Sequence, residues 1–143
     1  MRILADTNIL LRRIQRGHPQ HRQTREAIAE IVQRGDVLCV TAQNLIEFWA
    51  VCTRPIETNG LGILPAQASR ILSRIESSTL RLADDTDAVY GEWKKLVAAN
   101  GVSGKKSHDA RLVAAMNVNN VTHVLTFNID DFKRFPGIVP IRP

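Results

Sequence analysis

Short apolar runs that alternate with helical patterns are the feature that most constrains the fold of this chain. Five of them have the length and continuous apolar character of strands buried on both faces: residues 2–5, 37–40, 80–83, 121–125 and 138–141. Strands that alternate with helices predict a parallel sheet covered by helices on both faces. The expected fold class is α/β, a three-layer α/β/α sandwich with a central, mainly parallel sheet.

Residues suited to helix ends mark where the helices between these strands begin. A first helical pattern follows Pro19 and ends at residue 35. Thr41 is the expected N-cap of a helix that runs through residue 53, and Pro65 fits the first turn of the next helix. Asp85 or Thr86 should start a helix through about residue 99. Ser107 should cap a last helix that turns Ala110, Val113 and Ala114 to the core.

The 143 residues predict one domain, residues 1–143, because they can form one hydrophobic core and not two. No apolar run approaches the roughly 20 residues of a membrane helix, and the first apolar stretch is broken by Asp6 too soon for a signal peptide. We therefore expect a cytoplasmic protein without a membrane segment. Cys39 and Cys52 lie in apolar patterns and are expected to be buried thiols without a disulfide or a zinc site.

The charge of the chain points to a polyanionic partner. The net charge is +5, and fourteen of the nineteen basic residues are Arg, whose guanidinium groups bind phosphates in a forked geometry. A surplus of Arg can also serve solubility alone, so composition by itself leaves nucleic-acid binding open. Candidate contacts to a nucleic-acid backbone are Arg12, Arg13, Lys105 and Lys106.

Four acidic positions are expected to meet at one edge of the predicted sheet. Asp6 directly follows the first strand, Glu47 lies in the helix after the second, and residues 126–131 follow the fourth. The helix that carries Asp109 must end near the amino end of the fourth strand, so it begins at the carboxyl edge. The carboxyl ends of parallel strands form the usual ligand crevice of such sheets.

Carboxylates gathered in one cleft raise each other's pKa unless a cation neutralises them. Oxygen ligands suit Mg²⁺ or Mn²⁺, and the chain has no set of His and Cys residues that would favour zinc. A bound divalent ion can activate water and stabilise charge on a phosphate, which is the chemistry of nucleases. An acidic cleft in a basic protein therefore suggests a metal-dependent ribonuclease.

Each acid also has a purely structural explanation. Asp6 could end its strand in an Asx turn, and Glu47 could be an ordinary exposed residue of its helix. Asp109 would be favoured in a first helical turn by the helix dipole alone. Asp130 and Asp131 could simply start a turn. The tryptophans are expected in the core, and His108 is expected to be a cap or surface residue.

Several segments, taken together, resemble the PIN domain family, particularly the toxin subunits of VapBC toxin–antitoxin pairs. The segments are Ile3–Leu10, the helix around Glu47, His108–Ala114, and Leu125–Asn128 followed by the Asp131–Phe132 pair. The resemblance covers essentially the whole chain. It implies the same sandwich fold, a Mg²⁺- or Mn²⁺-dependent endoribonuclease activity on RNA, a homodimer, and a small antitoxin that blocks the acidic cleft.

The resemblance also assigns roles to individual residues. It places Asp6, Glu47 and Asp109 at the metal-binding, catalytic acids of the family. It implies that polar residues such as Asn8 and Thr126 orient these acids.

The fourth acid is open. Some family members have an Asp where this chain has Asn128, and others use the position of Asp131, which we prefer here over Asn128 and Asp130. An Asn at the fourth position would accept a metal-bound water without adding negative charge.

Two other functions are compatible with the sequence. A receiver-like signalling domain also collects acids and Mg²⁺ at this edge, and Asp84 and Asp85 after the third strand are reminiscent of one. The chain lacks the acidic pair at the first strand and the Lys after the last strand that such a domain needs. A catalytically idle PIN-like domain that binds RNA or a protein is the second alternative.

Overall fold

The computed structural model describes residues 1–143 and contains five strands, seven α-helices and one short 3-10 helix. The elements, in chain order, are β1 (Arg2–Ala5), α1 (Thr7–Ile14), α2 (His21–Gln33), β2 (Val37–Thr41), α3 (Ala42–Thr53), the 3-10 helix (Ile56–Thr58), α4 (Pro65–Ser77), β3 (Leu80–Leu82), α5 (Asp87–Ala99), α6 (Lys106–Val118), β4 (His123–Leu125), α7 (Ile129–Lys133) and β5 (Val139–Ile141).

The five strands form one sheet in the order β3-β2-β1-β4-β5, and every neighbouring pair is parallel. The expected α/β/α sandwich is confirmed, and its sheet is entirely parallel. After β1 the chain builds β2 and β3 on one side of that strand and then crosses to β4 on the other. The direction in which strands are added to the sheet therefore reverses between β1 and β4, and we call this place the reversal point of the sheet. Open α/β sheets bind ligands in the crevice at the carboxyl ends of the strands at such a point.

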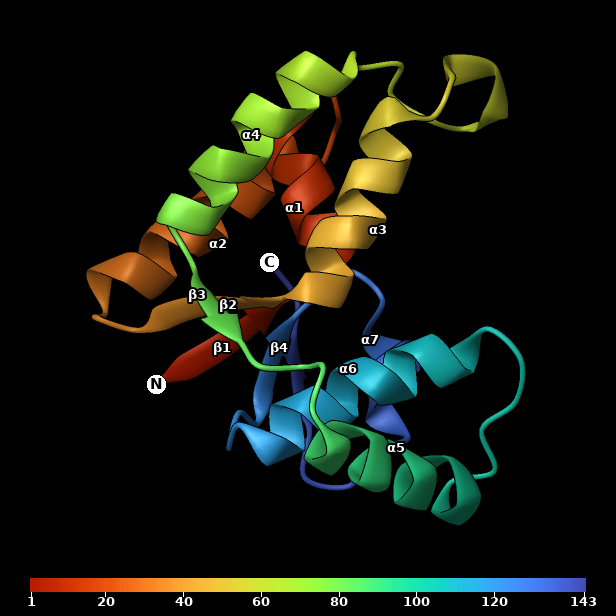
Figure 1. Cartoon of the computed structure of the whole chain (residues 1–143). Coiled ribbons are helices and arrows are strands. Elements are labelled where there is room, and N and C mark those ends of the chain that lie inside the picture. Colours follow the sequence, from red (N-terminus) through yellow and green to blue (C-terminus); the bar gives the residue numbers. More distant parts are fainter.

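Helices cover both faces of the sheet, so the strands are apolar throughout. Helices α1 to α4 lie on one side and α5, α6 and α7 on the other (Figure 1). Along β1, Ile3 and Ala5 belong to the first of two core clusters, and Leu4 belongs to the second. This alternation follows from the period of two along a strand, with both faces dry.

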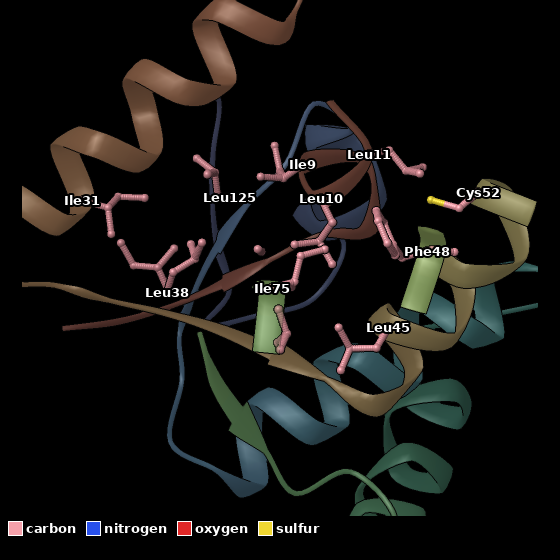
Figure 2. Packing of buried hydrophobic residues seen from close by; sticks show 14 residues of the cluster. Ile9, Leu10, Leu11, Ile31, Leu38, Leu45, Phe48, Cys52, Ile75 and Leu125 are labelled. Atoms are coloured by element: carbon pink, nitrogen blue, oxygen red, sulfur yellow. The ribbon is translucent and has the colours of Figure 1, made fainter. Parts of the chain in front are cut away.

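The core under α1 to α4 fixes the two helices that leave the carboxyl ends of β1 and β2. In Figure 2, Leu10 of α1 and Phe48 of α3 lie together above the strands, with Leu125 of β4 and Ile75 of α4 nearby. Phe48, Leu10 and Leu125 are almost completely buried. Because α1 follows Asp6 and α3 carries Glu47, this packing sets the relative position of the two acids.

The second core fixes α6 and α7 against the opposite face. Val113 of α6, Phe132 of α7 and Val124 of β4 share one buried cluster. The outer helix α5 packs along α6 through Val89 and Trp93. The acids at the starts of α6 and α7 are thereby brought to the carboxyl edge of β4.

Two local features differ from the sequence-based expectations. No element was predicted between Asp6 and residue 17, yet α1 begins at Thr7, with the Asp6 side chain accepting the Thr7 N–H. Ser107 was predicted as an N-cap, which is wrong: α6 begins at Lys106 and has no side-chain cap. Ser107 already lies in the first turn, where its N–H donates to the carbonyl of Gly104, a glycine at φ +59° that ends the preceding loop.

The expected helix caps and buried thiols are confirmed. Thr41 caps α3 reciprocally with Asn44, and Thr86 caps α5. Cys39 and Cys52 are buried free thiols. None of the helices combines the length and apolar character that crossing a bilayer requires.

Candidate active site

Asp6 lies directly after β1, at the reversal point of the sheet, and its side chain is held by residues of α1 and by the residue that follows β4. Its Oδ1 accepts the Thr7 N–H (2.7 Å), and its Oδ2 accepts the Asn8 side-chain amide (2.7 Å) and the Thr126 hydroxyl (2.7 Å). Asn8 and Thr126 therefore orient Asp6, as expected from the sequence. A carboxylate offers about four acceptor positions. Three are used here, which leaves room for one further ligand.

Glu47 reaches the same crevice from the second turn of α3. Its Oε2 accepts the Thr7 hydroxyl (2.8 Å), and its Oε1 accepts the side-chain amide of Gln43 (3.0 Å), one helical turn earlier. Both carboxylate oxygens are thus fixed in direction. The helical pattern alone left the role of Glu47 ambiguous. In the structure Thr7 links the two acids, because its N–H donates to Asp6 and its hydroxyl donates to Glu47.

Asp109 and Asp131 form the other half of the crevice. Asp109 lies in the first turn of α6 and Asp131 in α7, and Lys106 pairs directly with Asp131 while its ammonium lies 3.9 Å from Asp109 Oδ2. This lysine is the cation that the structure places among the acids. Asp109 and Asp131 therefore share one ammonium group, so their two negative charges are balanced only in part.

Two of the acids, Asp6 and Asp109, have a raised pKa in this arrangement. The pKa of Asp6 is raised to about 6, mainly by burial and also by the charges of Asp109 and Glu47, while hydrogen bonds from Thr126 and Thr7 oppose the shift. Burial also raises the pKa of Asp109, and the charges of Asp131 and Glu47 add to the effect while Lys106 opposes it. The acids predicted to meet are therefore close enough to repel one another.

The donor set of the crevice fits a hard divalent cation. The four acids offer carboxylate oxygens, as Mg²⁺ and Mn²⁺ prefer, and a cation would favour the charged form of Asp6 against the burial and the neighbouring charges that raise its pKa. No three of the acids converge as a ready-made metal cage. This is compatible with Mg²⁺, which proteins usually bind through one or two carboxylates together with water and substrate phosphate.

The three candidates for the fourth position differ in their surroundings. Asp131 pairs with Lys106 beside Asp109. The Asp130 side chain is 93% exposed and pairs with Lys133, away from the other acids. Asn128 is exposed, and its backbone N–H donates to the Thr126 hydroxyl. Of these three residues, only Asp131 is near enough to Asp109 to raise its pKa.

A buried polar network behind Glu47 was missed by the sequence analysis. Asp84, 4% exposed, accepts the Gln43 N–H (3.0 Å) and pairs with Arg111 (3.3 Å). Arg111 also donates to Gln43 Oε1 (2.8 Å), and the Gln43 amide donates to Glu47. The position of Asp84 just after β3, at the ligand edge, was the available clue.

Of the four residues predicted to bind a nucleic-acid backbone, two lie near the acids and two do not. Lys106 lies among the acids, and Lys105 precedes it, exposed, at the start of α6. Arg12 instead donates to Gln15 and Gln20 (2.7 and 3.1 Å), and Arg13 donates to Ser78 (3.1 Å). These two arginines lie at the far end of α1, and the structure does not bring them to the acids.

A family comparison agrees with this geometry. The PIN domain model matches residues 3–138, which run from β1 to the residue before β5. The chain belongs to the PIN domain family. Among curated protein sequences, none matches it.

Solved structures with the same fold cover almost all of this PIN domain. VapBC2 from Rickettsia felis, bound to a promoter DNA fragment, superimposes with a TM-score of 0.73 at 17% identity over 100% of this chain and 99% of that one. VapC20 from Mycobacterium tuberculosis, a toxin that cleaves the sarcin-ricin loop, has a TM-score of 0.71 at 18% identity and covers 99% of both chains. DNA-bound VapBC from Salmonella typhimurium has a TM-score of 0.70 at 20% identity over 99% of this chain and 98% of that one.

Family membership and the network behind Glu47 together remove the receiver-like alternative. In that alternative, Asp84 would contribute to an open acidic pocket. In this PIN domain Asp84 is instead buried and bound to Arg111 and Gln43. Its carboxylate supports the position of the Glu47 side chain through Gln43.

Proposed function

We propose that this PIN domain is a Mg²⁺- or Mn²⁺-dependent endoribonuclease and the toxin of a toxin–antitoxin pair. The observation that carries the proposal is the acidic crevice at the reversal point of the sheet, where burial and neighbouring carboxylates raise the pKa of Asp6. We further propose a cytoplasmic homodimer whose crevice is blocked by a small antitoxin. The VapBC structures that share its fold support the pairing with an antitoxin.

Asp6 and Asp109 are the proposed metal ligands, with Glu47 and Asp131 in support. A divalent ion held there would lower the pKa of a bound water and stabilise negative charge on the phosphate. The chain itself supplies orientation: Thr126 and Asn8 fix Asp6, while Thr7 and Gln43 fix both oxygens of Glu47.

The same residues suggest how the proton and the substrate are handled. Glu47 would accept a proton from the attacking water as the new P–O bond forms, and the bond to the leaving ribose oxygen would break as that oxygen takes up a proton from solvent water. The ammonium groups of Lys105 and Lys106, at the rim of the crevice, are suited to bind the RNA backbone.

Cleavage of a labelled RNA by purified protein, with Mg²⁺ or Mn²⁺ and with a chelator, tests the proposal. Asp6→Asn should lower the rate at least about 100-fold while the fold is kept. Asp131→Asn should also lower it, whereas the matched change Asp130→Asn should not, because Asp130 points to solvent. Full cleavage by Asp6→Asn would refute the proposal. RNA binding without cleavage in millimolar metal would favour the idle PIN domain instead.

A further inference from the structure

A cavity of about 460 Å³ opens beside the acidic crevice, between the start of α5 and the first turns of α6. Its lining combines two aromatic residues, Tyr90 and Trp93, with His108, Arg111 and three aspartates. None of these residues is part of the acid cluster described above. The volume is in the range of small-ligand sites.

One wall of the cavity is an aromatic pair. The rings of Tyr90 and Trp93 are stacked with centroids 5.8 Å apart and planes 25° from parallel. Trp93 is fixed by its indole N–H, which donates to the Ser107 carbonyl (2.9 Å), and by packing on the core. Tyr90 is 63% exposed. An exposed aromatic stack in a cavity is the type of surface on which nucleic-acid bases stack.

Hydrogen bonds through Gln43 link the cavity to the acidic crevice. Arg111 in its lining donates to Gln43, which binds Glu47. The Gln43 amide also donates to the carbonyl of His108 (2.9 Å), another lining residue, and Asp109 follows His108 in the chain. The cavity and the crevice therefore lie on two sides of the same short segment of α6, close enough for adjacent nucleotides.

The charges in the cavity suit a base and not a phosphate. Arg111 is already paired with Asp84, while Asp85 and Asp87 in the lining form no ion pair. Unpaired carboxylates repel a phosphate, and they accept hydrogen bonds from the amino groups of bases. The sugar–phosphate backbone would then stay on the side of Lys105 and Lys106.

We propose that this cavity binds the base of a nucleotide next to the cleaved phosphate, stacked on Tyr90, and that it contributes to the choice of cleavage site. The inference rests on the proposed ribonuclease function, since it assigns a subsite to the same substrate. Tyr90 is a specificity residue in this scheme, not a catalytic residue, because it touches a base and not the reacting atoms.

A double-mutant cycle between protein and RNA tests the subsite. Cleavage efficiency is measured with an RNA oligonucleotide that the wild-type protein cleaves in Mg²⁺, and with versions that lack one base at each position around the cut. Tyr90→Ala should lower the efficiency on the intact RNA by about 5- to 150-fold, the range found when one base–aromatic stack is removed. At one position of the RNA, removal of the base should lower the cleavage efficiency of the wild type by a similar factor. Removal of the same base should have little further effect on cleavage by Tyr90→Ala, because the stack is already lost.

Two matched variants accompany the cycle. Tyr90→Phe keeps the ring and should cleave like the wild type. Leu64→Ala removes a comparably exposed side chain, 66% exposed and outside the cavity, and should change nothing. Because Tyr90 lies on the surface, Tyr90→Ala should keep the midpoint of thermal unfolding of the wild type.

The outcomes separate this inference from the function on which it rests. If the wild type cleaves RNA but the losses from Tyr90→Ala and from every missing base simply multiply, the base subsite is refuted and the ribonuclease stands. An unchanged rate in Tyr90→Ala refutes the subsite equally. If the wild type cleaves no RNA in Mg²⁺ or Mn²⁺, the proposed function itself fails.

Discussion

The raised pKa of Asp6 predicts a specific dependence of stability on pH in the absence of metal. The folded protein holds a proton on this carboxyl up to about pH 6, whereas the ordinary value is 3.8. As the pH rises from about 4 to about 6, the unfolded chain releases this proton and the folded chain retains it. Stability therefore falls over this range, and it levels off above the folded pKa.

The size of the effect follows from the two pKa values. One pKa unit corresponds to about 1.4 kcal/mol, so the change from 3.8 to about 6 amounts to about 3 kcal/mol. About 2 kcal/mol of this falls between about pH 4 and about pH 7. The side chain of Asp6→Asn cannot ionise, so the stability of this variant should not fall over this pH range. The hydrogen bonds that the variant loses change its stability by the same amount at every pH, and this amount cancels when the pH dependence of the two proteins is compared.

Urea unfolding of the wild type and of Asp6→Asn, at a series of pH values in chelator, measures this difference. The free energy of unfolding of Asp6→Asn relative to the wild type should rise by about 2 kcal/mol from about pH 4 to about pH 7. Saturating Mn²⁺ should stabilise the wild type most where Asp6 is ionised. A difference that stays within about 0.5 kcal/mol over the whole range would show that Asp6 titrates normally, and the electrostatic picture of the crevice would be wrong.

Three further perturbations probe the packing and the polar contacts around the site. Phe48→Ala should destabilise the protein by about 3–5 kcal/mol in urea unfolding, because it empties a fully buried position on the helix that carries Glu47. Arg111→Ala should cost about 3 kcal/mol, because it leaves the buried Asp84 carboxylate without its cation. Lys106→Ala should raise the pKa of Asp109, measured by carboxyl NMR titration, because Lys106 holds that pKa down.

Each of these has a result that would contradict its reasoning. A loss below about 1 kcal/mol for Phe48→Ala would mean that the core closes around the gap. Combining Arg111→Ala with Asp84→Ala should cost less than the sum of the single changes, and strict additivity would show that the pair is not coupled. An unchanged Asp109 titration in Lys106→Ala would place the lysine outside the electrostatics of the crevice.

Most of the architecture was predictable because both faces of the sheet are buried. Continuous apolar runs at β1, β2 and β4 identify strands of a parallel sheet, and the positions of acids just after strands then follow from topology. The helix α1 was not predicted. Its eight residues include the consecutive apolar residues Ile9, Leu10 and Leu11, and such a short segment shows no clear helical period.

The missed parts of the site depend on contacts between distant segments. Asp84, Gln43 and Arg111 come from three separate elements, and nothing local in the sequence pairs them. The open choice between Asp130 and Asp131 is similar, because neighbours in a short helix differ only in the direction they face. The structure separates them through their lysine partners, Lys133 and Lys106.

Calorimetric titration of Mn²⁺ into the wild type, Asp6→Asn and Asp130→Asn, with RNA cleavage measured on the same samples, tests the central proposal most directly. The acidic crevice predicts that the wild type and Asp130→Asn bind Mn²⁺ alike and both cleave RNA. It predicts at least tenfold weaker binding to Asp6→Asn, a loss of about 1.4 kcal/mol or more, with cleavage lost in parallel. Equal Mn²⁺ affinity and equal cleavage in all three proteins would contradict it.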